Sequence, residues 1–226
     1  MKTRFKVLSI LAVVIFAANT LSMAAYDGFE GMIKYKIEYE GEGLDATTKA
    51  QMPGEMIMYY KGDLIRSEQV SPMYSMASIS NVEDGSVIIL MDFMGQKFAV
   101  KQSGEELEAA KDEAEAEEPA KPEIKYIDET KVIAGYTCKK AEVIQDGETM
   151  EVYYTDEISV PQVETAQNSI EGLDGMLMEF TIVQEGMTMT MSVQEVKKSK
   201  VKKHLFTIPS DYEEKSMEEF RTMFGG

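Results

Sequence analysis

Hydrophobic and charged residues alternate near the start of the chain, and this period of two constrains the fold more than any other feature. The segment 33–40 reads IKYKIEYE. In a strand such alternation places the apolar side chains on one face and the charged ones on the other. The same pattern predicts further strands at 55–60, 64–70, 86–92, 97–101, 124–128, 131–134, 136–145, 149–155, 176–184, 187–196 and 205–208.

Glycine-containing turns separate several of these strands, as in Asp146-Gly147 and Glu185-Gly186. Many sequential strands joined by tight turns are typical of antiparallel meanders. The sequence therefore predicts a mainly β (α+β) fold, in which an antiparallel sheet curls into a barrel, a half-barrel or a sandwich.

Three segments depart from the strand pattern. Residues 104–122 are rich in Glu and Ala and predict a solvated helix or a disordered acidic insertion. Residues 159–175 predict an irregular connection across one face or end of the sheet. Ser210 lies three residues before Glu213, as in a capping box, and the apolar residues that follow predict a C-terminal helix packed on the sheet.

The N-terminus has the features of a secretory signal peptide. Lys2, Arg4 and Lys6 precede the short apolar run 7–18, and Ser22-Met23-Ala24 supplies a small-x-small cleavage pattern. We expect residues 1–25 to be a signal peptide and residues 26–226 to be one β-rich domain with the acidic insertion at about 104–122. The expected location is outside the cytoplasm, in the periplasm, with no integral membrane span after cleavage.

Charge and residue usage exclude several classes of function. The net charge of −17 becomes about −20 once the three basic residues of the leader are removed. Such an acidic chain repels nucleic-acid phosphates, so we expect no nucleic-acid partner. Cys138 and His204 are the only cysteine and histidine, and the sequence contains no motif for a metal, cofactor or nucleophile. We therefore expect a non-catalytic protein without a cofactor.

Methionine is unusually frequent, with 18 residues. Several alternate along predicted strands and would share a face, so we treat them as candidate ligand-binding residues: Met56, Met58, Met176, Met178, Met187, Met189 and Met191. Three interpretations stay open, namely core packing, a deformable apolar cavity, and a soft-metal site for Cu(I) or Ag(I).

Some segments resemble known exported proteins. IAGYTCKKA at 133–141, YYTDEISVP at 153–161 and IEGLDGMLMEF at 170–180 resemble motifs of the GLPGLI-type family. Within the last segment Asp174, Met176 and Leu177 depart from the family pattern. The ending FTIPSDY at 206–212 resembles a related group of exported domains of unknown function. The resemblance implies a curved antiparallel sheet like that of the LolA and LolB lipoprotein carriers.

These observations together predict an exported, non-catalytic protein that binds a lipid, an acyl chain or another apolar ligand in the cell envelope. Two alternatives remain. One is an envelope protein-interaction module with a filled core and no small ligand, for which the sequence does not name the partner. The other is a methionine thioether site for a soft metal ion.

Overall fold

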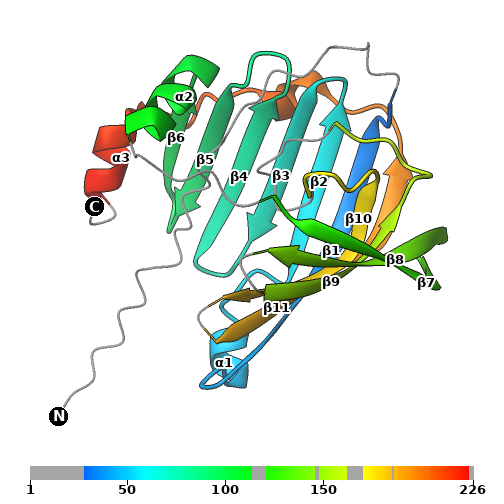
Figure 1. Ribbon diagram of the computed structural model, residues 1–226. Coiled ribbons are helices and arrows are strands. Elements are labelled where there is room, and N and C mark those ends of the chain that lie inside the picture. The colour runs from blue at the N-terminus through cyan, green and yellow to red at the C-terminus, as the bar shows by residue number, and fades with distance from the viewer. Residues whose placement is uncertain (1–27, 114–120, 146–147, 162–169, 185, 224–226) are drawn as a thin grey trace.

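The computed structural model describes residues 28–113, 121–145, 148–161, 170–184 and 186–223, and most of these residues lie in one curved sheet (Figure 1). Its strands are β1 (Gly31–Gly41), β2 (Glu55–Lys61), β3 (Leu64–Val70), β4 (Tyr74–Asn81), β5 (Val87–Phe93), β6 (Gln96–Gln102), β7 (Glu123–Ile133), β8 (Tyr136–Gln145), β9 (Glu148–Thr155), β10 (Met176–Gln184), β11 (Met187–Lys198) and β12 (Glu213–Lys215). The helical segments are α1 (Ala46–Lys49), α2 (Gly104–Glu113), α3 (Met217–Met223) and the 3₁₀ helix η1 (Lys203–Phe206).

The strand order is β12-β6-β5-β4-β3-β2-β1-β11-β10-β9-β8-β7. Each strand pairs antiparallel with its neighbours, except that β12 runs parallel to β6. Two meanders, β1–β6 and β7–β11, are thus joined side by side through the pairing of β1 with β11. The predicted mainly β, mostly antiparallel fold is confirmed.

The larger core lies on the face of the sheet that carries Tyr35, Met58 and Phe180, which we call the inner face. Ile33 and Tyr35 of β1 are fully buried there, next to residues of β2, β8, β9, β10 and β11. The Tyr35 hydroxyl donates a hydrogen bond to the carbonyl oxygen of Leu177 at 2.9 Å. Because a buried hydroxyl needs a partner, this bond fixes the position of the Tyr35 ring within the apolar cluster.

The irregular connection expected at 159–175 contributes to this core where the structure describes it. Ile158, Val160 and Leu173 are buried, and Phe29 N–H donates to the carbonyl oxygen of Ser159 at 2.9 Å. Residues 162–169 of that predicted connection lie outside the described residues.

A second core lies on the opposite face of β2–β6. Its buried residues are Ala77, Ile79, Leu90, Ala99, Val201 and Phe206. The last two belong to the segment that follows β11 and includes η1, so this segment covers that face. The prediction of a strand at 205–208 is wrong: Leu205 and Phe206 belong to a 3₁₀ helix, whose Leu205 N–H donates to the carbonyl oxygen of Lys202.

The predicted C-terminal helix exists but begins later than expected. Residues 213–215 form β12 beside Phe98–Val100, so the cap is Ser216 and not Ser210. The Ser216 hydroxyl accepts from the N–H of Glu219 at 3.1 Å, and the Glu219 carboxylate accepts from the N–H of Ser216 at 2.8 Å. Phe220 then packs on Met91 and Val100, which confirms that the helix docks on the sheet.

Two strand predictions also need correction. The sequence analysis missed β4, because its segment YSMASISN alternates small and polar residues with only a few large apolar ones. The strands expected at 124–128 and 131–134 are one strand, β7, whose register against β8 shifts between Ile127 and Thr130. A bulge of this kind interrupts the alternation without ending the strand.

The acidic insertion begins as a helix. Residues 104–113 form α2, and Leu107 is buried, whereas 114–120 lie outside the described residues. The expected signal peptide at 1–25 also lies outside them. Within the described ranges, no helix has the length and apolar character needed to cross a membrane.

The cap at Ser216 provides a test of the C-terminal helix. Ser216→Ala removes a side-chain acceptor for an orphan N–H of the first turn, and we expect the free energy of unfolding to fall by about 1 kcal/mol. Urea titration followed by circular dichroism measures it. The matched control is Ser210→Ala, which should change stability by less than about 0.5 kcal/mol. Equal losses in the two variants would contradict this assignment.

Candidate functional site

The methionines singled out from the sequence are mostly core residues. Met56, Met58, Met176, Met178 and Met191 are buried, while Met187 and Met189 are partly buried. Met187, Met189 and Met191 share the inner face, opposite Gly41, Tyr39 and Ile37 of β1, as their alternation predicted.

Two thioether sulfurs of β2 accept hydrogen bonds, one from a residue of the same strand and one from a residue of the neighbouring strand β3. The Tyr60 hydroxyl donates to Met58 Sδ, and Gln69 Nε2 donates to Met56 Sδ, each at 3.6 Å. These methionines therefore fill space between strands and satisfy polar neighbours. The ligand-binding role expected for the seven methionines is not tested by this arrangement and stays a prediction.

The lone cysteine is part of the core. Cys138 is buried, its Sγ donates to the carbonyl oxygen of Tyr136 at 3.5 Å, and burial raises the pKa of its thiol. His204 lies exposed in η1. In the part of the chain that the structure describes, no three His, Cys, Asp or Glu side chains are grouped to hold a metal ion.

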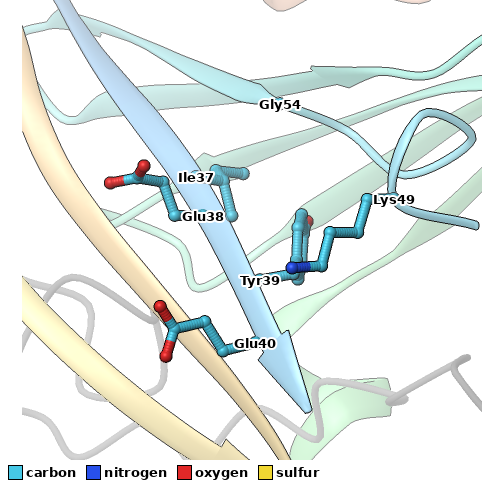
Figure 2. Close-up of a pocket in the computed structure, with 6 residues that line it drawn as sticks. All are labelled: Ile37, Glu38, Tyr39, Glu40, Lys49 and Gly54. Carbon is cyan, nitrogen blue, oxygen red and sulfur yellow. The ribbon is translucent and has the colours of Figure 1, made fainter. Parts of the chain in front are cut away.

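One hollow, of about 300 Å³, lies where β1 extends beyond β2 (Figure 2). Its lining residues are Ile37, Glu38, Tyr39, Glu40, Lys49 and Gly54. In Figure 2 the Lys49 side chain reaches toward Tyr39, and the two carboxylates extend on the other side of the strand. This agrees with the alternation of β1, which puts Tyr39 on the inner face and Glu38 and Glu40 on the outer face.

Tyr39 is held firmly at this hollow. Its hydroxyl donates to the carbonyl oxygen of Pro53 at 2.9 Å. Burial, together with the nearby Tyr74 hydroxyl, raises the pKa of Tyr39 to about 12. Since the neutral phenol is favoured, Tyr39 acts at neutral pH as a hydrogen-bond donor and an aromatic surface, not as a base.

A second hollow, of about 340 Å³, lies beside the edge strand β7. It is lined by Lys121, Pro122, Ile124, Tyr126, Glu171 and Gly172. The Tyr126 side chain is 63% exposed, which is unusual for a large aromatic residue on a sheet.

The ring of Tyr126 rests against Tyr154. The two ring centroids are 6.3 Å apart with an interplanar angle of 58°, and Tyr154 itself is buried. Burial raises the pKa of Tyr154, and the Tyr126 hydroxyl adds to this effect. The Tyr126 ring therefore packs against the Tyr154 ring while remaining exposed to solvent.

Charged groups border this second hollow. Lys121 Nζ lies 2.8 Å from a carboxylate oxygen of Glu171. The turn that carries Glu171 is held by Leu173, which is buried and whose N–H donates to the carbonyl oxygen of Ile170 at 3.0 Å. An exposed aromatic ring flanked by an ammonium and a carboxylate can bind a ligand that has one apolar face and several hydroxyl groups.

A third cluster surrounds Tyr153 on the outer face. Lys131 Nζ and Lys140 Nζ lie 5.1 and 5.9 Å from the centroid of its ring, and its hydroxyl donates to Glu129. That hydrogen bond to Glu129 raises the pKa of Tyr153. The lysines also pair with Glu179 and Glu151, at 2.7 and 2.8 Å, so each ammonium of this cluster has a carboxylate partner within the protein.

Sequence reasoning identified neither hollow. It treated Tyr39 as an ordinary sheet-face residue and gave no role to Tyr126. For Tyr126, the position of KPEIKYIDE just after the acidic insertion indicates an edge strand, where an aromatic side chain remains accessible. The hollow at Tyr39 exists because β1 is longer than the part of it that pairs with β2. The local sequence does not reveal this difference in length.

The part of the chain from β6 to β12 identifies its family. The family model described as N-glycanase peptide, N-terminal domain, matches residues 97–216, which is more than half of the chain. The chain therefore belongs to this family of N-terminal domains. The matched segment contains the whole Tyr126 hollow.

Solved structures of PNGF-II are similar to the chain. In the P21 crystal form the identity is 19%, the TM-score is 0.48, and the alignment covers 86% of this chain and 33% of that chain. In the C2 form the corresponding values are 20%, 0.46, 86% and 32%. The chain thus spans about a third of the length of these proteins. No curated protein matches the chain.

The family match corrects two predictions from the sequence. The GLPGLI-type resemblance is wrong, because the segments on which it rested, 133–141, 153–161 and 170–180, fall inside the N-glycanase N-terminal domain. The resemblance of 206–212 to a related group of exported domains is corrected by the same match. The expected function as a lipid-binding or acyl-binding envelope protein is wrong as well, because the matching family model describes an N-glycanase N-terminal domain.

The raised pKa of Tyr39 predicts a specific alkaline sensitivity. An unfolded tyrosine ionises near pH 10, so the stabilisation present below pH 10 is lost as the pH rises toward the folded pKa of about 12. At pH 11 the share of Tyr39 in this loss is about 1 kcal/mol. In Tyr39→Phe the difference in unfolding free energy between pH 8 and pH 11 should shrink by that amount. Identical pH dependence in wild type and variant would refute the prediction.

Proposed function

We propose that this protein is an exported, non-catalytic recognition domain that binds N-glycosylated proteins, with the glycan held at the Tyr126 hollow. The observation that carries the proposal is the exposed Tyr126 ring inside the segment that matches the N-glycanase N-terminal domain. The name of the family supplies the class of ligand, and the hollow supplies a surface with suitable chemistry.

A sugar ring presents an apolar C–H face and a rim of hydroxyl groups. The apolar face fits the supported ring of Tyr126, with Ile124 and Pro122 extending the apolar floor. The hydroxyl groups at the rim fit the Lys121–Glu171 pair, because an ammonium donates and a carboxylate accepts hydrogen bonds. Each half of the ligand thus meets groups of matching chemistry.

The proposal assigns no catalytic role to the described residues. The carboxylates at both hollows are exposed, and both groups of the Lys121–Glu171 pair lie on the surface. A general acid or base is normally tuned by burial or by a specific neighbour. We therefore expect an N-glycopeptide incubated with the protein to keep its glycan, as judged by mass spectrometry.

The half-barrel shape expected from the sequence is part of this proposal. The core of the inner face takes buried residues from the adjacent strands β3, β2, β1, β11, β10, β9, β8 and β7, which requires the sheet to bend around it. A crystal structure in which the sheet is flat and open would contradict the half-barrel shape.

Binding should depend on the ring of Tyr126. Tyr126→Ala removes the stacking surface, and we expect at least a tenfold weaker affinity for a synthetic N-glycopeptide in isothermal titration calorimetry. Tyr126→Phe keeps the ring and should stay within threefold of wild type. Because the side chain is 63% exposed, Tyr126→Phe should alter the free energy of unfolding by less than about 0.5 kcal/mol. Tyr126→Ala also loses the ring contact with Tyr154 and should lower it by about 1 kcal/mol.

Two controls distinguish recognition of the glycan from nonspecific binding of the peptide. Val132→Ala alters another exposed residue of the same strand, 70% exposed, and should leave affinity unchanged. The same peptide without its glycan should not bind. Equal binding of both peptides, or full affinity in Tyr126→Ala, would overturn the proposed function.

Export is the second part of the proposal, and it is supported by the basic, apolar and small-residue segments of positions 1–25. Protein recovered from the periplasmic fraction of a bacterial host should begin at Ala25 or Tyr26, as read by intact-mass measurement. A full-length mass, or retention in the cytoplasmic fraction, would count against export.

A further inference from the structure

A basic segment follows β11 in a chain that is otherwise acidic. Residues 197–204 read KKSKVKKH, and no Asp or Glu occurs between 196 and 210. All the lysines of this segment are exposed. We call them the lysine patch: Lys197, Lys198, Lys200, Lys202 and Lys203. Like charges placed so close together repel one another, so their clustering costs the folded state free energy and is not explained by stability.

The backbone beneath the lysine patch is fixed within the fold. Val201 N–H donates to the Glu30 carboxylate at 2.8 Å, and Val201 and Phe206 are buried in the second core. The carbonyl oxygen of Leu205 accepts a hydrogen bond from Arg66 Nη1 at 2.8 Å. The lysines therefore project from an ordered main chain, which loses little conformational entropy when a ligand binds.

The lysine patch lacks carboxylate partners. In the described part of the chain, none of the ion pairs includes an ammonium group of the patch. Glu30 contacts the segment, but its carboxylate is bonded to Lys61 at 2.5 Å and to Val201 N–H. These two hydrogen bonds lower the pKa of Glu30, and the charge of Lys200 adds to the effect. Glu30 thus pairs with a lysine outside the patch, and the patch faces solvent with its charge unmatched.

The surroundings of the lysine patch argue against two kinds of anionic partner. Proteins that bind single-stranded nucleic acids combine a basic groove with aromatic side chains that stack on the bases. Residues 197–205 contain no Phe, Tyr or Trp. Stable attachment to a membrane normally needs an inserted apolar group besides basic residues. None of the exposed large apolar side chains lies between 196 and 210.

Every strong cation of the patch is a lysine. Arg is favoured where two parallel hydrogen bonds hold one carboxylate or phosphate, whereas Lys acts as a point charge. Lys200 and Lys202 flank the buried Val201, and residues two apart in an extended chain are separated by about 6.6 Å. Basic runs of this length are typical of surfaces that bind linear polyanions such as heparin. The patch therefore fits a linear polymer with anionic groups at intervals along it.

We propose that the lysine patch binds a sulfated polysaccharide. The sulfate groups of such a polymer are spread along a linear chain, and the polymer requires neither base stacking nor insertion of an apolar group. The net charge of −17 opposes the approach of a polyanion. At physiological ionic strength, however, exposed charges more than about 8 Å away are largely screened, so the lysines decide the interaction at contact. This site is separate from the Tyr126 hollow and does not depend on the proposed glycan recognition.

Fluorescently labelled heparin is the probe for this site. We expect saturable binding by fluorescence anisotropy, and binding should weaken at least tenfold between about 0.05 and about 0.5 M salt because salt screens the charges. Desulfated heparin of the same length should bind at least tenfold more weakly. Polyglutamate and single-stranded oligothymidine are the competing ligands. Binding of either one as tightly as heparin would overturn the choice of a sulfated polysaccharide.

Two matched double variants test the location. Lys200→Gln with Lys202→Gln removes two charges of the patch and should weaken heparin binding at least fivefold. Lys36→Gln with Lys139→Gln removes two charges from exposed lysines that have carboxylate partners elsewhere, and its affinity should stay within twofold of wild type. Because the substituted side chains are exposed, the urea midpoint of unfolding should be the same in both variants.

The outcomes distinguish a defined patch from attraction by net charge. Weaker binding in the patch variant alone, together with loss of binding on desulfation, supports the proposal. Equal weakening in both double variants would mean that net charge controls binding, and unchanged affinity in the patch variant would mean that heparin binds elsewhere. Either result would overturn the proposal. N-glycopeptide binding at Tyr126 should persist in both variants, so failure of this proposal can be told apart from failure of the proposed function.

Discussion

The antiparallel pairing of β1 with β11 is the interaction on which the structure depends. It joins the N-terminal meander, β1–β6, to the C-terminal meander, β7–β11, over the full length of β1. Because the two strands lie far apart in sequence, their pairing closes a long loop, and its entropic cost must be offset by buried apolar surface. Tyr35, Ile37, Met191 and Val193 on the inner face supply that surface directly at the junction.

The buried hydroxyl of Tyr35 adds a directional contact at this junction. Its bond to the carbonyl oxygen of Leu177 connects β1 to β10, two strands away. The buried phenol thereby has an acceptor for its hydroxyl group, and the ring also packs edge-on against Phe180. Hydrophobic burial and a single polar bond together fix how the two meanders meet.

Both hollows occur where strand pairing stops. Tyr126 lies on β7, which is an edge strand of the sheet. Tyr39 lies in the part of β1 that extends beyond its pairing with β2. Inside the sheet, side chains of neighbouring strands cover one another and ladders satisfy the backbone. At an edge an aromatic ring remains exposed and backbone groups remain accessible. The edge of this otherwise filled sheet is therefore a suitable place to bind a partner, and the proposed glycan site at Tyr126 lies there.

The amount that could be predicted differed between features. Strands 64–70, 136–145 and 176–184 matched the structure residue for residue, since turn residues next to them in the sequence mark where each strand begins or ends. The capping pattern was recognised, but Ser210 and Ser216 both satisfy it, and only the pairing of β12 with β6 excludes the first. The family resemblance failed because it relied on short motifs whose residues serve the sheet and not a specific function.

The sequence by itself determined the class of structure: alternation of period two dictates strands with one apolar face, and those faces must be buried together. It also determined the acidic character of the surface and the absence of disulfides. Only the tertiary structure decided which methionines are buried and where the pairing of β1 with β2 ends. It also decided that the Tyr126 ring packs against Tyr154 and yet stays exposed to solvent. These features depend on strand order and relative strand length, which arise from contacts between distant segments and leave no local pattern.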